Sequence, residues 1–117
     1  MGTPMAPNYA NLLMVTLEKK MIEEFHHNRK LDKPSGTALF LQKTLRKTVK
    51  KKVPRPLAIR GGGIYGIHKV HAMTDEEHII VEHSALNRSV FARGAVRAAA
   101  WLADKSPGQY ELADLLK

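Results

Sequence analysis

The stretch IHKVHAMTDEEHIIVEHS, residues 67–84, decides the fold. Its two halves, Ile67–Met73 and His78–Ser84, are rich in β-branched and apolar residues, and the polar run 74–76 lies between them. Such runs on either side of a short polar turn predict two strands of one sheet. We therefore expect a mixed or antiparallel sheet at the centre of the fold.

Both faces of this sheet carry apolar side chains. Alternation along the second strand separates two sets of residues: Ile79, Val81 and His83 on one face, and His78, Ile80 and Glu82 on the other. Helices packed on one face and a partner sheet on the other would cover both. The predicted fold is α+β, with a mixed, largely antiparallel sheet of about four strands. Helices pack on one of its faces, and the other is available for oligomerisation.

Further strands and helices are predicted on both sides of this stretch. The expected strands are Ile22–Phe25 and Leu57–Arg60, and the expected helices are Asn11–Lys20, a helix from near Ser35 or Thr37 to Val49, and Ser89–Asp104. The second helix is supported by apolar residues that recur at helical spacing: Ala38, Leu41, Leu45 and Val49. Residues 111–116 suit either a helix or a strand.

A glycine-rich segment, Gly61–Gly66, matches the pattern G-x-G-x-x-G of dinucleotide-binding proteins. That pattern needs a helix immediately afterwards, whose amino-terminal amides hold a pyrophosphate. Residues 67–71 alternate as a strand instead. We interpret the segment as a turn between strands.

Composition limits the classes of protein to which the chain can belong. Its 117 residues, 44% of them hydrophobic, suffice for one compact domain, and the absence of cysteine excludes disulfides and thiolate metal sites. The apolar run 95–103 is too short to span a membrane, and the amino terminus has no export signal. We expect a cytoplasmic protein without a membrane partner.

A net charge of +8 favours anionic partners, and much of the excess lies in residues 43–55. Four basic residues of this run lie outside the apolar stripe of their helix, as on an ordinary solvated face: Lys43, Arg46, Lys47 and Lys50. Nucleic-acid binding is not expected, because no aromatic residue is interleaved with the basic ones.

Four histidines of the predicted strands raise the question of a metal site. Residues an odd number of positions apart on a strand face opposite ways, which separates His68 from His71 and His78 from His83. A convergent set of ligands among them, and hence a bound metal, is not expected.

Residues 24–38 combine a protonatable loop with a helix start. The amides of Gly36 and Thr37 and the hydroxyls of Ser35 and Thr37 would lie at the positive end of the helix dipole, which favours a carboxylate ligand. Three side chains beside this start can exchange protons: His26, His27 and Lys30. The combination suits a reductase that binds an acidic substrate and protonates it.

The same stretch resembles the H-H-x-x-K-x-D-x-P-S-G-T-A motif of the dihydrodipicolinate reductases at every specified position, from His26 to Ala38. Other segments resemble the family too: Ala6–Tyr9 its A-P-N-[FY], Arg60–Gly62 its R-x-G, Gly66–His68 its G-x-H, and Asn87–Ala95 its S-R-x-x-F-A-x-G-A. The resemblance covers nearly the whole chain and points to the family's C-terminal domain, which binds substrate and forms tetramers.

The resemblance implies a role for each part of the site. His26 would donate or accept a proton, and Lys30 would be a second proton donor to the imine that is reduced. Residues that would bind the substrate carboxylates are His27, Ser35, Gly36 and Thr37. The nicotinamide of NADPH or NADH would lie against Ala6, Pro7, Asn8 and Tyr9. A homotetramer through the sheet is implied as well.

No dinucleotide-binding unit precedes Ala6 in this sequence, and the segment between Asn8 and Ile22 is shorter than the family usually shows. Residues 1–117 are therefore expected to be a single C-terminal domain of an enzyme of lysine and diaminopimelate synthesis, inactive alone. Two alternatives stay open: a structural oligomerisation domain whose active-site loop is a relic, and, less favoured, a basic nucleic-acid-binding module.

Overall fold

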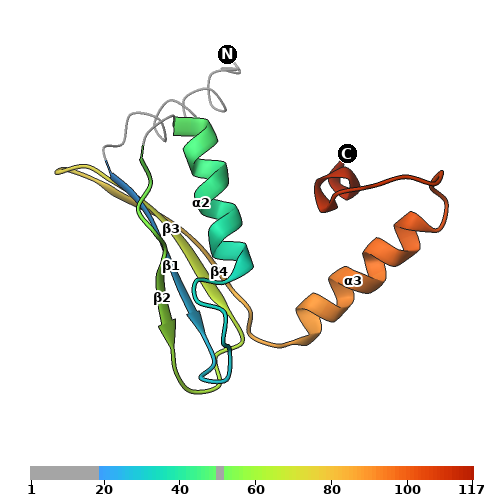
Figure 1. Cartoon of the computed structure of the whole chain (residues 1–117), viewed down its shortest axis with the longest axis horizontal. Coiled ribbons are helices and arrows are strands. Elements are labelled where there is room, and N and C mark those ends of the chain that lie inside the picture. The colour runs from blue at the N-terminus through green and yellow to red at the C-terminus, as the bar shows by residue number, and fades with distance from the viewer. Residues whose placement is uncertain (1–18, 50–51) are drawn as a thin grey trace, which may run out of the picture. The chain divides into compact units, whose positions relative to one another are not determined.

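The computed structural model describes residues 19–49 and 52–117. The chain divides into two compact units, one ending at Ser84 and the other formed by Ala85–Lys117. Within the described residues, the first unit holds a sheet and one helix, and the second holds a helix and a short 3-10 helix (Figure 1).

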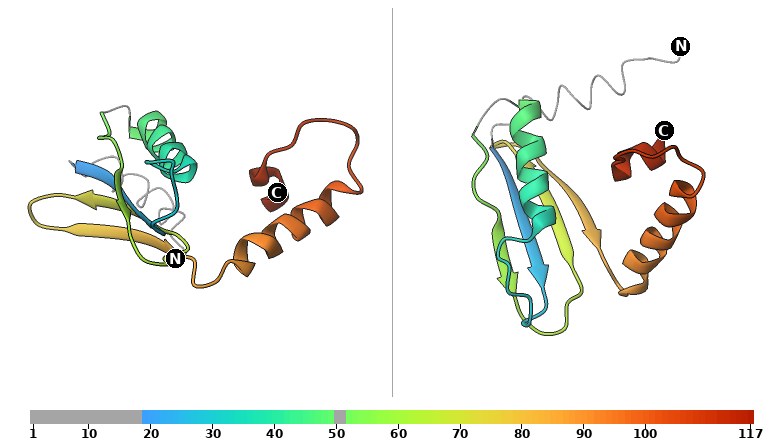
Figure 2. Two further views of the ribbon diagram at one scale, coloured as in Figure 1. Left: turned by 60° about the horizontal axis from the view of Figure 1, so that its bottom comes forward. Right: turned by 45° about the vertical axis from the view of Figure 1, so that its right-hand side comes forward.

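A four-stranded mixed sheet forms the first unit. Its strands are β1 (Lys19–His26), β2 (Leu57–Arg60), β3 (Ile67–Met73) and β4 (His78–Ser84). They lie in the order β2-β1-β3-β4, where β1 and β2 are parallel and the other two pairs are antiparallel. Helix α2 (Gly36–Val49) lies across one face of the sheet (Figure 2). The α+β prediction is confirmed.

Alternate residues of β1 face α2. The buried residues of the strand are Lys20, Ile22, Glu24 and His26, and the half-buried residues between them are Met21, Glu23 and Phe25. Small and branched apolar side chains complete the core under the helix: Ala38, Val49, Val53 and Ala72. The row of side chains that contributes Ile22 to this core therefore also buries a carboxylate and an imidazole.

The start of α2 is capped by Ser35, one of the two predicted caps; the other was Thr37. The Ser35 hydroxyl accepts a hydrogen bond from the amide of Ala38 at 3.2 Å, which satisfies one of the unpaired amides of the first turn. Farther along, the buried side chain of Gln42 donates to the carbonyl of Val53 at 3.1 Å. This bond holds Val53, which lies between α2 and β2, against the helix.

Two residues at the start of β1 correct a prediction. Lys19 and Lys20, expected at the end of a helix, are paired with Met73 and Ala72 in the antiparallel ladder instead. Backbone pairing with β3 overrides the local helical preference of these lysines. The rest of that expected helix, residues 11–18, lies outside the described part of the chain.

The predicted turn at Gly61–Gly66 leads directly into β3. Gly62 has a φ of 56°, in the left-handed region that glycine enters at little cost. The interpretation of this segment as a turn between strands is confirmed.

The second unit consists of α3 (Ser89–Leu102) and the 3-10 helix η1 (Leu112–Leu116). Helix α3 ends two residues before the predicted Asp104, and Trp101 meets the ring of Tyr110 edge-on with centroids 5.5 Å apart. Helix α3, which is described in full, has no buried residue. No helix in the described part of the chain combines the length and the hydropathy that crossing a membrane needs.

Candidate active site

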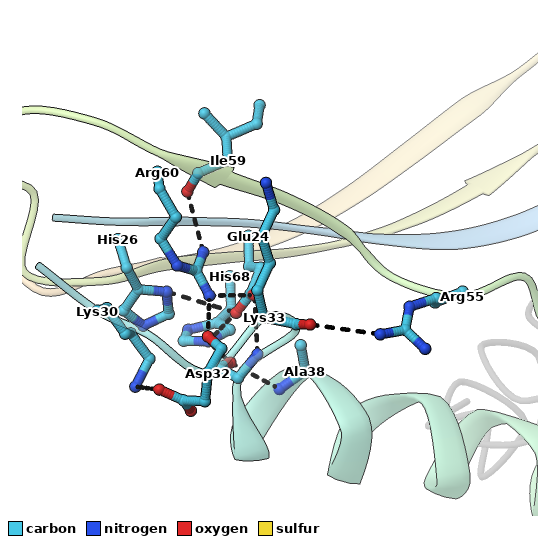
Figure 3. Close-up of polar contacts among 11 residues, drawn as sticks. Glu24, His26, Lys30, Asp32, Lys33, Ala38, Arg55, Ile59, Arg60 and His68 are labelled. Carbon is cyan, nitrogen blue, oxygen red and sulfur yellow. Dashed lines mark hydrogen bonds and ion pairs between the residues drawn. The ribbon is translucent and has the colours of Figure 1, made fainter. Parts of the chain in front are cut away.

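The polar site lies at one end of the sheet, where three strands meet the start of α2 (Figure 3). His26 is the last residue of β1 and is paired with Arg60, the last residue of β2. His68 is paired with Glu24 across the antiparallel β1–β3 ladder. Ser35 immediately precedes α2. Strand pairing therefore brings residues of three strands together, and the start of α2 adds Ser35.

Glu24 is the centre of this cluster, with a fully buried side chain. Its Oε1 accepts hydrogen bonds from the amide of Ser35 at 2.8 Å and from Nη2 of Arg60 at 2.9 Å. Its Oε2 lies 3.4 Å from Nδ1 of His26 and 3.6 Å from Nε2 of His68. Burial raises the pKa of Glu24, but the hydrogen bonds from Ser35 and Arg60 outweigh burial, so that the pKa lies below its ordinary value of 4.5. The carboxylate is ionised at neutral pH.

The two imidazoles beside Glu24 are neutral at neutral pH. Burial lowers the pKa of His26 below its ordinary value of 6.5; the charge of Glu24 opposes this change, and Arg60 and Lys30 add to it. Burial lowers the pKa of His68 as well, again against the charge of Glu24. The two rings meet edge-to-face, with centroids 5.0 Å apart and an interplanar angle of 71°.

The ring of His26 lies close to the backbone of Gly66. A Cβ atom at position 66 would lie 3.3 Å from Nε2 of His26, closer than side-chain carbons ordinarily come. Glycine at this position therefore leaves room for the imidazole.

The loop that follows β1 is fastened to the end of β2. The amide of Gly61 donates to the carbonyl of His26 at 3.0 Å, and Nη2 of Arg60 donates to the carbonyl of Asp32 at 2.6 Å. On the same loop, Nζ of Lys30 lies 2.9 Å from Oδ1 of Asp32, and this hydrogen bond lowers the pKa of Asp32. These contacts hold Lys30 near the cluster.

The three residues predicted to bind substrate at the start of α2 differ in burial and in the hydrogen bonds that they already make. Ser35 is buried, its amide donates to Glu24, and its hydroxyl lies 3.2 Å from Nε2 of His68. Gly36 and Thr37 are exposed, and a Cβ atom on Gly36 would meet nothing within 4 Å. The open part of the helix start is therefore Gly36 and Thr37.

The remaining predicted residues fall in three places. His26 belongs to the cluster, and Lys30 acts on it electrostatically. His27 is half-buried; its carbonyl accepts a hydrogen bond from the amide of Lys30 at 3.2 Å, and within the described residues its Nδ1 has no hydrogen-bond partner. Residues 6–9, predicted to lie against a nicotinamide, are outside the described part of the chain.

A hollow of about 270 Å³ opens beside the cluster on the face of the sheet that α2 covers. Its wall includes Thr37 from the start of α2, His68 from β3 and His83 from β4. The exposed start of α2 and the imidazole of His68 therefore border the same hollow.

Comparison with known sequences identifies the family of the chain. The sequence profile described as dihydrodipicolinate reductase, C-terminus, matches residues 4–116. The chain belongs to this family. A 4-hydroxy-tetrahydrodipicolinate reductase of Bdellovibrio bacteriovorus is 60% identical over 95 residues, which cover 81% of this chain and 42% of that protein. The reductase of Nitratidesulfovibrio vulgaris is 40% identical over 129 aligned positions, which cover 93% and 49% respectively.

A solved structure has the same fold as this chain. It is the dipicolinate-bound dihydrodipicolinate reductase from Paenisporosarcina sp. TG-14, with a TM-score of 0.69 and 20% identity, covering 91% of this chain and 48% of that one. The chain spans about half the length of the reductases that it matches.

Sequence reasoning missed three members of the site: Glu24, Arg60 and His68. One local signal was present, because Glu24 precedes His26 by two positions and so lies on the same face of β1. Arg60 and His68 lie in the segments that resemble the family, but nothing local to them indicates that they approach Glu24.

The cluster also has the spacing of a metal site. Glu24, His26 and His68 each offer one ligand atom, and these atoms lie within 4.8 Å of one another. Two contacts compete with a cation, since Arg60 holds one carboxylate oxygen of Glu24 and the hydroxyl of Ser35 lies against Nε2 of His68. The prediction that no metal binds compared only histidines on strands and did not consider this set.

Proposed function

We propose that this chain supplies the substrate-binding and proton-delivering part of a 4-hydroxy-tetrahydrodipicolinate reductase in lysine and diaminopimelate synthesis. The substrate would be a cyclic imine dicarboxylate that receives hydride from NADPH or NADH. One observation carries the proposal: a buried imidazole, His26, lies beside an open helix start and a nearby lysine. The names of the relatives support the same reaction.

Binding of the two carboxylates would use the positive end of α2. The exposed Gly36 and Thr37 present the amides that a helix start leaves without intrahelical partners. Lys30 and His27 would add charge and hydrogen bonds from the loop. The hollow beside Thr37 and His68 gives room for the ring of the substrate.

Proton delivery would fall to His26 and Lys30. Reduction of the imine adds a hydride to carbon and a proton to nitrogen, so the site must supply one proton for each turnover. A neutral His26 with a lowered pKa readily gives up a proton once it has gained one, and Lys30 could deliver or replace that proton.

The described residues do not form a complete cofactor site. NADPH or NADH, when bound, supplies the hydride, but the glycine-rich turn Gly61–Gly66 enters a strand and offers no helix start to a pyrophosphate. We therefore propose that a dinucleotide-binding domain is needed beside this chain, and that Ala6–Tyr9 would border the nicotinamide.

Calorimetry with pyridine-2,6-dicarboxylate, a planar mimic of the substrate, tests the proposal on this chain. The Lys30→Ala variant should bind about ten-fold more weakly or worse, because a charge-assisted hydrogen bond contributes about 1.5–3 kcal/mol. The matched control is Lys47→Ala on the exposed side of α2, which should bind normally. Absence of binding by the unmodified chain, or equal losses in the two variants, would refute the proposed site.

The uncovered face of the sheet favours self-association as a further part of the function. Leu57 is 52% exposed, Ile59 44% and Ile80 49%, and the register places all three on the face that α2 leaves uncovered. We propose that this face packs against a second copy within a homotetramer. Light scattering should give a mass above the monomer. Assembly without dicarboxylate binding would favour the purely structural alternative.

A further inference from the structure

The role of Glu24 goes beyond the groups that bind substrate or deliver protons in the proposed reaction. A buried carboxylate is costly unless donors compensate it, and here the two strong donors, the amide of Ser35 and the guanidinium of Arg60, both bond to Oε1. Oε2 has no hydrogen-bond partner within the described residues, and neither has Nδ1 of His26, 3.4 Å away. One unused acceptor and one unused ring nitrogen therefore face each other.

Nδ1 of His26 is the ring nitrogen nearer to this acceptor. It lies 3.4 Å from Oε2, whereas Nε2 of His68 lies 3.6 Å from Oε2 and 3.2 Å from the hydroxyl of Ser35. In the tautomer of His68 in which Nε2 accepts from Ser35, that nitrogen carries no proton, and Nδ1 of His26 is the donor that remains for Oε2.

We infer that Glu24 is a positioning residue for His26: it holds the imidazole with its Nδ1 proton towards the carboxylate, which leaves Nε2 as the atom that exchanges a proton with the substrate. The inference rests on the proposed function and deepens it. A carboxylate in this position fixes the tautomer and stabilises the imidazolium form, as the aspartate does in hydrolytic triads. A Cβ atom at position 66 would lie 3.3 Å from Nε2, so glycine there keeps this nitrogen free of a crowding side chain.

Among the charged groups that act on His26, Glu24 is the one that favours the protonated ring. The groups that act on the ring come from every neighbouring segment: Glu24 from β1, Arg60 from β2, His68 from β3 and Lys30 from the loop. Glu24 is the acidic one among them, and its charge raises the pKa of His26 while burial and the others lower it. Without this charge the ring would bind its proton only at lower pH.

Nitrogen-15 NMR of the histidine rings in this chain measures the tautomer and the titration directly. The unmodified chain should show His26 with its proton on Nδ1. In Glu24→Gln the titration of His26 should move to lower pH and the Nδ1–H preference should weaken. The matched control is Glu23→Gln, one residue away on the opposite face of β1, which should leave His26 unchanged.

Three outcomes would overturn the inference: a predominant Nε2–H tautomer in the unmodified chain, a folded Glu24→Gln whose His26 titrates unchanged, or equal changes in the two variants. The tautomer of His26 is measured in the unmodified chain, so this result tests the inference even if Glu24→Gln does not fold. A carboxylate that only clamps Arg60 and Ser35 would alter stability without this change in His26. Failure of dicarboxylate binding would instead refute the proposed function while these readings still decide the role of Glu24.

Discussion

Two adjacent glutamates on β1 form two different clusters. Glu24 faces α2, is fully buried, and has Arg60 and two imidazoles around it. The side chain of Glu23 is 23% exposed on the opposite face, where its Oε2 lies 3.2 Å from Nε2 of His71 and 3.9 Å from Nζ of Lys69. Both faces thus combine a carboxylate, histidine and a cation.

The difference between the faces is burial rather than composition. On the outer face of the single chain, Nδ1 of His71 lies 2.8 Å from Nε2 of His78 in an exposed contact, where water or a second copy can replace lost partners. On the inner face, each donor and acceptor depends on the others, because burial makes an unpaired group costly. The same residue types therefore form a site on one face and surface ion pairs on the other.

Turnover should show the largest difference between substitutions on the two faces of the sheet. Alone, the chain should show no NADPH oxidation with the imine substrate, since fixing the reactants contributes about 7–11 kcal/mol to lowering a barrier. Once a matching dinucleotide-binding domain is joined to it, His26→Gln should lower turnover about 100-fold or more. His71→Gln on the outer face should retain turnover. Equal losses of turnover from the two substitutions would contradict the proposal that the catalytic residues lie on the inner face.

The second-largest difference is expected in the free energy of unfolding, between substitutions of Glu24 and Glu23. Glu24→Ala leaves Arg60 partly buried without its carboxylate and should lower the free energy of unfolding by about 3–5 kcal/mol. Glu23→Ala breaks partly exposed contacts with His71 and Lys69 and should cost about 1 kcal/mol or less. Urea denaturation followed by circular dichroism measures both values. Similar losses would show that burial does not distinguish the two carboxylates.

The pH dependence of stability should show a smaller difference. Because folding lowers the pKa of His26 and His68, the unfolded chain binds more protons, and their contribution to stability is present above pH 6.5 and is lost as pH falls towards the folded values. The lowered pKa of Glu24 has the same sign, with a loss that begins near pH 4.5. Urea midpoints between pH 7.5 and 5 should fall less in His68→Gln than in the unmodified chain. The reverse order would contradict the assigned shifts.

Local patterns predicted much of the fold because they encode local structure. Alternation in residues 67–84 and the polar turn within it predicted β3 and β4, and the apolar repeat after Ser35 predicted α2. The parallel pairing of β1 with β2 and the extension of β1 to Lys19 depend on partners far away in the chain, which single-strand patterns do not contain.

The candidate site was predictable where one segment holds its residues. His26, Lys30 and Ser35 lie within ten positions of one another, so a motif could indicate them. Glu24 was missed because its burial and ionisation depend on Arg60, 36 positions away, and on the amide of Ser35. The roles assigned to these residues stay predictions until the binding and turnover experiments are made.

The pleat of β1 restricts how this segment can change in length during evolution. Loss or gain of one residue between Met21 and Glu24 would turn every side chain beyond that point to the opposite face. A deletion would bring Phe25 and His27 into the positions now held by Glu24 and His26, and an insertion before Glu23 would bring Glu23 and Phe25 there. Loops generally tolerate insertions, but descendants of this sequence that keep the inner cluster must vary β1 by substitution alone or by pairs of residues.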